Sequence, residues 1–208
     1  MIRWLLCCAL LLTAVGARAQ EPSAPDDANT ARPPVSAEFV DLFSAYCLKR
    51  FPDDTSLAAQ AVGDGHRALS PAEVGSFLHV DPGLGWMIAG HETSYVLTVQ
   101  VPPFHACAVR RYSETLLDSA PFIAAARAFA ASEGHKLAPP LARDRPIGNG
   151  IVSSGLYFQE LDGDGKPLSE AFMFFAVRYP AVARADGAPS KPFWEIRFVR
   201  QIHIPNSI

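Results

Sequence analysis

Residues 94–101 alternate between hydrophobic and polar positions with a period of two, which is typical of a β-strand. The apolar positions on one side of this strand are Tyr95, Leu97, Val99 and Val101. The alternation resumes over residues 104–111, after Pro102 and Pro103. These prolines lack backbone donors, and a Pro-Pro pair is not a tight-hairpin turn. The pattern therefore predicts one kinked edge strand, with residues 84–89 as its antiparallel partner.

The chain before these strands has a helical period. Ser36 is a favourable N-cap and Pro52 ends the pattern. A second, short helix is predicted over residues 55–62 with Asp54 as its cap, and a third begins with the capping box at residues 70–73. The first helix has an apolar stripe along one side, formed by Phe39, Leu42, Phe43, Tyr46 and Cys47.

The second half of the chain predicts one helix and three strands. The helix falls within residues 113–133 and is followed by an irregular segment at 139–149 that contains three prolines. The strands are predicted at residues 151–161, 170–179 and 193–204, and the last alternates cleanly between apolar and polar residues. We therefore predict an α+β domain, with an antiparallel sheet of five or six strands and helices mainly on one face. The other face is expected to be at least partly open to water.

The N-terminal residues have the layout of a secretory signal peptide. Arg3 supplies positive charge, residues 4–15 form an apolar run, and Ala17-Arg18-Ala19 is a small-x-small cleavage site. The run is too short for a stable membrane span. Cys7 and Cys8 lie inside the run rather than after it, so no lipid anchor is predicted.

These signals divide the chain into a signal peptide at 1–19, a disordered linker at 20–34 and a single α+β domain at 35–208. The formal net charge of −3 becomes −5 when Arg3 and Arg18 leave with the signal peptide. This acidity and the absence of Lys/Arg runs argue against nucleic acid or anionic lipid as a partner. No membrane span is expected after cleavage, and the predicted location is the periplasm or the exterior.

Two cysteines, Cys47 and Cys107, remain after the predicted cleavage. An oxidising compartment favours a disulfide between them. The disulfide would close a loop of 60 residues and contribute about 4 kcal/mol in the chain-entropy view. The alternatives are two buried free thiols, or a metal site with His105 at His-x-Cys spacing. A zinc site needs four ligands, and Cys47 has no companion at a suitable spacing.

No motif supplies a complete catalytic, cofactor-binding or metal-ligating set. Asp162-Gly163-Asp164-Gly165 begins like a calcium loop, but Lys166 and Pro167 occupy the positions that require Asp or Asn and Gly. We predict a solvated hairpin turn there. His91-Glu92 begins like a zinc-protease motif, but Tyr95 stands where the second histidine belongs. Catalytic, cofactor and metal sites are therefore all predicted to be absent.

Four arginines fall on two predicted strands: Arg110 with Arg111, and Arg197 with Arg200. If these strands are neighbours, the arginines could form a small anion site. Pairing of cross-strand charges with Glu195 is the simpler interpretation, and we favour it.

Four segments of the chain form a recognisable layout: Tyr46-Cys47-Leu48, Pro82-Gly83-Leu84-Gly85-Trp86, Val101-Pro102-Pro103 and Ala106-Cys107-Ala108-Val109-Arg110. In these features the chain resembles a family of small exported or lipid-anchored proteobacterial proteins of unknown function. The four segments cover about the first half of the chain that follows the signal peptide. Unlike the lipid-anchored members, this chain has no usable lipidation cysteine. The resemblance implies no activity, cofactor or catalytic residue.

Two function classes follow from these observations. We favour a non-catalytic envelope module that binds a small ligand or another envelope protein through the open face of the sheet or the Pro-Pro edge. The alternative is an unrecognised periplasmic hydrolase that uses His91 or His105 with Glu92 or Asp81. The positions of these side chains in the fold discriminate between the two classes.

Overall fold

The computed structural model describes residues 36–91, 93–102, 104–181 and 190–203. The predicted signal peptide and linker lie outside the described residues. The helices are α1 (Ala37–Phe43), the π-helical turn η1 (Ser44–Leu48), α2 (Asp54–Gly63), α3 (Pro71–Leu78) and α4 (Ala120–Ser132). The strands are β1 (Arg67–Ala68), β2 (Gly83–Ala89), β3 (Ser94–Gln100), β4 (Phe104–Ser113), β5 (Lys136–Leu137), β6 (Leu141–Gly148), β7 (Ile151–Leu161), β8 (Pro167–Tyr179) and β9 (Phe193–His203).

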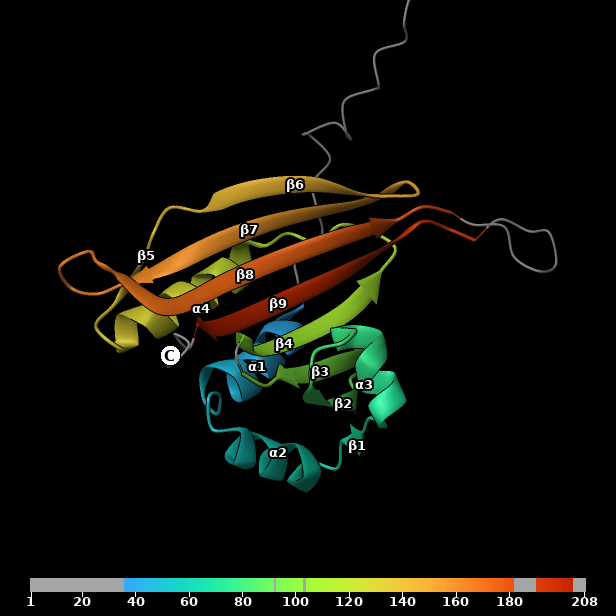
Figure 1. Ribbon diagram of the computed structural model, residues 1–208, viewed down its shortest axis with the longest axis horizontal. Coiled ribbons are helices and arrows are strands. Elements are labelled where there is room, and N and C mark those ends of the chain that lie inside the picture. The colour runs from blue at the N-terminus through green and yellow to red at the C-terminus, as the bar shows by residue number, and fades with distance from the viewer. Residues whose placement is uncertain (1–35, 92, 103, 182–189, 204–208) are drawn as a thin grey trace, which may run out of the picture. The chain divides into compact units, whose positions relative to one another are not determined.

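In this part of the chain all nine strands form one antiparallel sheet (Figure 1). The strand order is β1-β2-β3-β4-β9-β8-β7-β5, and β6 also pairs with β7. Residues 151–157 of β7 pair with β6, whereas residues 160–161 pair with β5, so β6 and β5 together form one edge of the sheet. The α+β class is confirmed, and the sheet has more strands than the five or six predicted.

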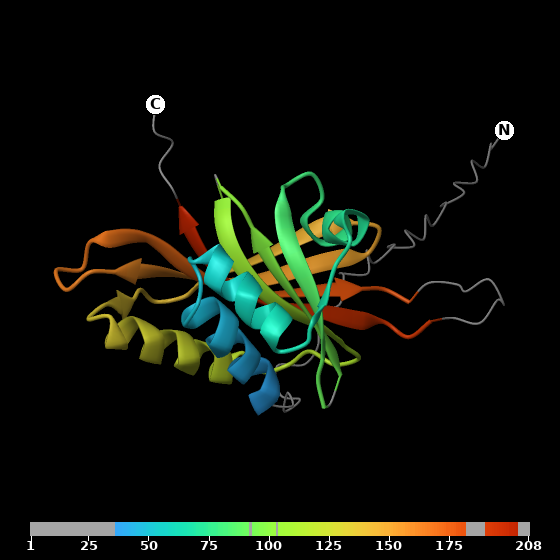
Figure 2. The ribbon, with the colours of Figure 1, turned by 90° about the horizontal axis from the view of Figure 1, so that it is seen from below.

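One face of the sheet, which we call the core face, packs against α1, η1 and α4 (Figure 2). Phe198 of β9 lies at its centre, with ring centroids 4.2 Å from Phe39 of α1 and 4.3 Å from Phe122 of α4. All three rings are fully buried. The predicted alternation of β9 is therefore confirmed, because Ile196 and Phe198 face the helices.

The helix starts follow the capping signals of the sequence. The Ser36 side chain accepts a hydrogen bond from the Phe39 amide, and Ser70 with Glu73 forms the predicted capping box. The predicted cap of α2 is wrong by one residue. Asp53 is the N-cap and accepts from the Ser56 amide at 3.0 Å. Because the helix begins one residue earlier than expected, the Asp54 carboxylate is available for a contact with the sheet.

The strand predicted as a kinked edge is instead two neighbouring strands of a hairpin. β3 pairs with β4 in antiparallel register, with Gln100 opposite Ala106. β4 also pairs with β9 and is therefore an interior strand. The reversal takes residues 101–105, which is longer than the two-residue turn that would need positive φ. Pro102 lies in this connection, where no ladder donor is required.

The segment predicted to be irregular, residues 139–149, contains strand β6. All residues of β6 are exposed, and the strand pairs only with β7. An exposed edge strand has no buried side, so it lacks the hydrophobic alternation that marks interior strands. Pro146 is tolerated because an edge strand has one side without ladder bonds. Gly148, Asn149 and Gly150 then turn the chain with positive φ values of 111°, 51° and 74°.

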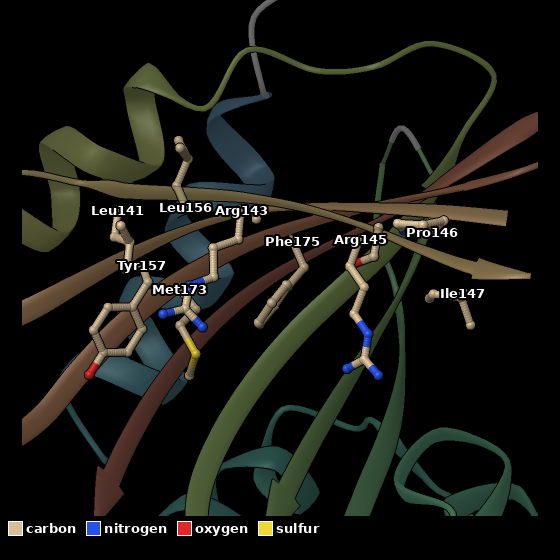
Figure 3. Close-up of a pocket in the computed structure, with 11 residues that line it drawn as sticks. Leu141, Arg143, Arg145, Pro146, Ile147, Leu156, Tyr157, Met173 and Phe175 are labelled. Carbon is tan, nitrogen blue, oxygen red and sulfur yellow. The ribbon is translucent and has the colours of Figure 1, made fainter. Parts of the chain in front are cut away.

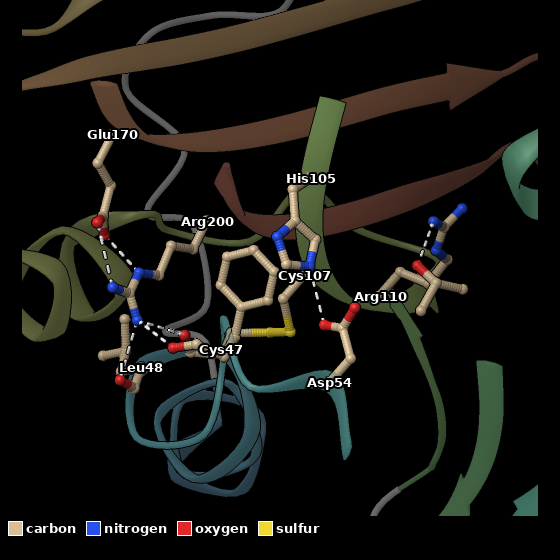
Figure 4. Close-up of a disulfide and its surroundings, with 10 residues drawn as sticks. Cys47, Leu48, Asp54, His105, Cys107, Arg110, Glu170 and Arg200 are labelled. Carbon is tan, nitrogen blue, oxygen red and sulfur yellow. Dashed lines mark hydrogen bonds and ion pairs between the residues drawn. A yellow bond between two sulfur atoms is a disulfide. The ribbon is translucent and has the colours of Figure 1, made fainter. Parts of the chain in front are cut away.

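The predicted disulfide between Cys47 of η1 and Cys107 of β4 is present, with Cα atoms 5.4 Å apart (Figure 4). Both residues are fully buried. His105, Cys107 and Val109 all lie on the core face, so the bridge joins the first helical segment directly to an interior strand.

A buried arginine, Arg200 of β9, lies beside this bridge on the core face (Figure 4). Its Nη1 donates to the carbonyl oxygens of Cys47, Leu48 and Phe51 at 3.0, 3.0 and 2.8 Å. Its Nε and Nη2 donate to the two carboxylate oxygens of Glu170 in β8. The side chain thus ties the end of η1 to two neighbouring strands.

Candidate binding site on the open sheet face

The sheet face opposite the helices α1 and α4 is the open face, and the strand registers arrange its residues in three rows across the sheet. The first row is Leu141, Tyr157, Met173, Val199 and Ala108. The second row is Arg143, Gly155, Phe175, Arg197 and Arg110. The third row is Arg145, Ser153, Val177, Glu195 and Tyr112. Each row runs from β6 through β7, β8 and β9 to β4.

A groove of about 830 Å³ lies on the β6–β8 part of this face. Figure 3 shows the side chains of Arg143, Arg145, Tyr157, Met173 and Phe175 projecting into it from the same side of the sheet, away from α4. The volume falls in the range of about 300–1,000 Å³ that is usual for small-molecule sites. The groove is therefore large enough to hold a ligand.

The floor of the groove is apolar. Met173 packs with Val199, Ala106 and Ala108 in a small cluster, and Tyr157 and Phe175 lie against it. This cluster is separate from the main core on the other face of the same strands.

Gly155 of β7 makes room for the floor. A Cβ atom at this position would lie 3.2 Å from two ring atoms of Phe175, closer than ordinary packing. The absence of a side chain at Gly155 therefore lets the Phe175 ring lie close to the neighbouring strand.

Arg143 and Arg145 stand at the β6 side of the groove. Both are exposed, and neither guanidinium group forms a hydrogen bond or ion pair with another described residue. Two guanidinium groups beside an apolar floor provide donors for an anionic group of a ligand.

A charge network that includes the buried residues Arg110 and Glu195 lies on the same face of the sheet, on the neighbouring strands β9 and β4. Glu195 accepts hydrogen bonds from Arg110 at 3.3 Å, Arg197 at 2.7 Å and the Tyr179 hydroxyl at 3.2 Å. Burial, with the neighbouring charge of Arg197, lowers the pKa of Arg110 to about 10, so its guanidinium remains protonated at neutral pH. Burial also raises the pKa of Tyr179, and the Glu195 carboxylate adds to this shift.

The cross-strand pairing that the sequence favoured is therefore present, because Glu195 lies between Arg110 and Arg197. The four arginines do not form one anion site. Arg111 and Arg200 lie on the core face, since neighbouring residues of a strand point to opposite sides.

Helix α3 covers the remaining part of the open face, over β2 and β3. Arg110 lies over the Phe77 ring at 5.0 Å, and Leu78 fills the space above Gly83. This coverage explains why Val96 and Thr98 are buried, although the sequence pattern places them opposite the core. The groove is thus the part of the sheet that α3 leaves open.

The residues of the hydrolase alternative have other partners. His105 is buried, and its Nε2 lies 2.8 Å from the Asp54 carboxylate rather than near Asp81 (Figure 4). Asp81 accepts a hydrogen bond from the Gln100 side chain at 2.9 Å. The backbone amide of His91 donates to Glu38, and Glu92 lies outside the described residues. His105 with Asp54 therefore ties α2 to β4.

The predicted hairpin turn at Asp162 is confirmed between β7 and β8. Its Oδ1 accepts from the Asp164 and Lys166 amides at 2.9 and 2.8 Å, so this carboxylate stabilises the turn itself. Within the described ranges, no cluster of His, Cys, Asp or Glu has the arrangement of a metal site. In the same ranges, none of the helices has the length and hydrophobicity needed to cross a membrane.

The sequence interpretation missed the groove residues Arg143, Arg145, Met173 and Phe175. A signal was available in β8, where residues 171–177 are all apolar, at odd and even positions alike. Such a pattern gives a strand apolar side chains on both faces, and so it indicates a second apolar surface opposite the helices.

No protein-family model matches the chain, and comparisons with curated proteins and with solved structures give no match. The resemblance to small exported proteobacterial proteins stays a prediction.

Proposed function

We propose that this chain is an exported, non-catalytic module that binds a small, largely apolar ligand in the groove of the open face. The observation that carries the proposal is the groove itself, which has an apolar floor formed by Tyr157, Met173 and Phe175. Burial of apolar ligand surface against such a floor is the main driving force for binding.

The surroundings of the groove support a binding role. The floor belongs to the two adjacent strands β7 and β8 of a sheet whose other face is packed by helices, so it is held on rigid elements. The charged residues that line the groove are arginines, which suit recognition and electrostatic orientation better than acid–base chemistry at neutral pH. His105 is engaged by Asp54 on the opposite face.

A neutral fluorescent probe, N-phenyl-1-naphthylamine, tests this function on the purified mature protein. We expect saturable binding with a rise in fluorescence. Met173→Glu places a charge on the floor and should weaken binding by about tenfold or more, because tenfold corresponds to only about 1.4 kcal/mol. Ser153→Trp, which fills the groove from β7, should weaken binding similarly and provides a second variant if Met173→Glu does not fold.

Val62→Glu is the matched control, since Val62 lies on α2 and is 66 % exposed. This variant should bind the probe as the unaltered protein does. Absence of saturable binding in the unaltered protein, or equal affinities in all the variants, would refute the proposal. The export part of the proposal is tested by the N-terminus of the periplasmic protein, which should be Gln20. Retention of Met1 would contradict it.

A further inference from the structure

The alternation of β6 sorts its charged residues between the two faces of the sheet. Arg143 and Arg145 pair with Gly155 and Ser153 in the rows of the open face. Asp144 pairs with Ser154 and so belongs to the opposite face. The acidic residue between the two arginines therefore does not neutralise them in the groove.

Glu195 is the acidic residue of the three rows, and its carboxylate is already paired. Glu195 accepts hydrogen bonds from Arg110, Arg197 and Tyr179. The three rows carry the charges of Arg110, Arg143, Arg145, Arg197 and Glu195, and this set has an excess of positive charge. The open face is therefore locally cationic.

Apolar surface continues from the floor to the rim beside these arginines. Leu141 and Ile147 of β6 also line the groove and are 48 % and 58 % exposed. Exposed apolar side chains next to a hollow indicate a surface that is covered in use. The ligand that fits both features has an apolar body and an anionic end.

We propose that the groove binds a long-chain carboxylate, with its alkyl chain on Tyr157, Met173 and Phe175 and its carboxylate between Arg143 and Arg145. The proposal rests on the binding function above and adds the ligand class. The two arginines are two residues apart on one strand, roughly 7 Å, so both long side chains can reach one head group.

A carboxylate and a phosphate can both accept two parallel hydrogen bonds from the fork of a guanidinium group. The smaller charge of the carboxylate favours it over the phosphate. A carboxylate carries one charge, so less solvation free energy is lost when it approaches an apolar floor than for a doubly charged phosphate. The alkyl chain needs no specific partner, and the flexible Met173 side chain can adapt to it.

The test is displacement of N-phenyl-1-naphthylamine from the mature protein at low salt and pH 8, with every competitor kept below its aggregation concentration. The competitors are dodecanoate, its neutral methyl ester and dodecyl phosphate. We expect dodecanoate to bind about tenfold more tightly than the ester, a modest difference for charge-assisted hydrogen bonds. The double variant Arg143→Gln/Arg145→Gln should lose this preference, which is measured as the ratio of the affinities for dodecanoate and the ester within the same variant.

Arg127→Gln is the control, because Arg127 is exposed on α4 and lies outside the groove. It should keep the preference for dodecanoate. Equal affinities for dodecanoate and the ester, or a preference that survives in the double variant, would overturn this inference while leaving the binding function intact. Much tighter binding of dodecyl phosphate would overturn the choice of carboxylate.

A second copy of the chain is the competing occupant of the groove. A dimer that dodecanoate does not dissociate, and that the arginine double variant abolishes, would assign the face to self-association and overturn the proposal. Sedimentation at several protein concentrations with and without dodecanoate decides this point. A failure of the probe itself to bind would instead refute the proposed function.

Discussion

Removal of the Arg200 side chain is expected to be among the most damaging changes in this fold. Arg200 is 6 % exposed and makes five hydrogen bonds, three to carbonyl oxygens at the end of η1 and two to Glu170. Its guanidinium also lies over the Phe129 ring at 4.4 Å. In Arg200→Met an apolar chain of similar length fills the space but leaves these acceptors without donors.

The size of the stability loss in Arg200→Met follows from the carboxylate and carbonyl groups that lose their hydrogen-bond donor. Breaking a buried ion pair by removing one partner costs about 3–5 kcal/mol, because the other charge stays buried. Each buried carbonyl that loses its donor adds up to about 1–3 kcal/mol, although these terms are not additive. We therefore expect Arg200→Met to lower the free energy of unfolding by at least about 3 kcal/mol. Removing the carboxylate as well, in Arg200→Met/Glu170→Met, should recover part of this loss.

Urea unfolding followed by circular dichroism measures the effect, with the midpoint compared at unchanged slope. Arg127→Met is the matched control and should stay within about 0.5 kcal/mol of the unaltered protein, because Arg127 is exposed on α4. A loss below about 1 kcal/mol in Arg200→Met would refute the reasoning, because that is the scale of an ordinary hydrogen bond. A double variant less stable than the single variant would show that Glu170 is not left as an unpaired charge.

Two further predictions concern the bridge and a buried carboxyl. Replacement of Cys47 and Cys107 by alanine should lower the free energy of unfolding by about 4 kcal/mol, since the bridge closes a loop of 60 residues. Two free thiols per chain in denatured, unreduced mature protein would contradict the bridge. Burial, and secondly the charge of Glu170, raise the pKa of the Glu160 carboxyl in the folded protein. Protonated Glu160 therefore stabilises the fold at a pH below the ordinary pKa of glutamate. This contribution is lost as the pH rises through the raised pKa. The stability advantage of the unaltered protein over Glu160→Gln should therefore shrink from pH 4 to pH 7 in urea unfolding, and a constant difference would contradict the assignment.

The sequence correctly predicted those parts of the fold that a local side-chain pattern determines by itself. The capping box at Ser70 and the alternation of β9 are local signals, and both are present in the structure. The disulfide was predictable because only Cys47 and Cys107 remained after the expected cleavage. Its consequence for packing, an interior strand joined to η1, required the strand order.

The errors have a common origin in interactions across long sequence distances. Strand β6 exists because β7 offers it a ladder, and its own residues are exposed and polar, so no local period marks it. The hairpin at residues 101–105 was missed because a tight turn was assumed where a longer connection is present. Arg200 interrupts the apolar side of β9. Its role depends on carbonyl groups that lie 149 to 153 residues earlier in the sequence.

The charge of the open face shows most directly why the proposed binding site could not be predicted from composition. The chain as a whole is acidic, with a formal charge of −3, which argued against anionic lipid as a partner. The row that contains Arg143, Gly155, Phe175, Arg197 and Arg110 takes one residue from each of five strands, and only their register brings three arginines into one line. Net charge averages over both faces of the sheet, whereas a bound head group responds to charges within about 8 Å at physiological salt. The exclusion drawn from composition therefore applies to extended anionic surfaces and not to a single carboxylate held in a groove.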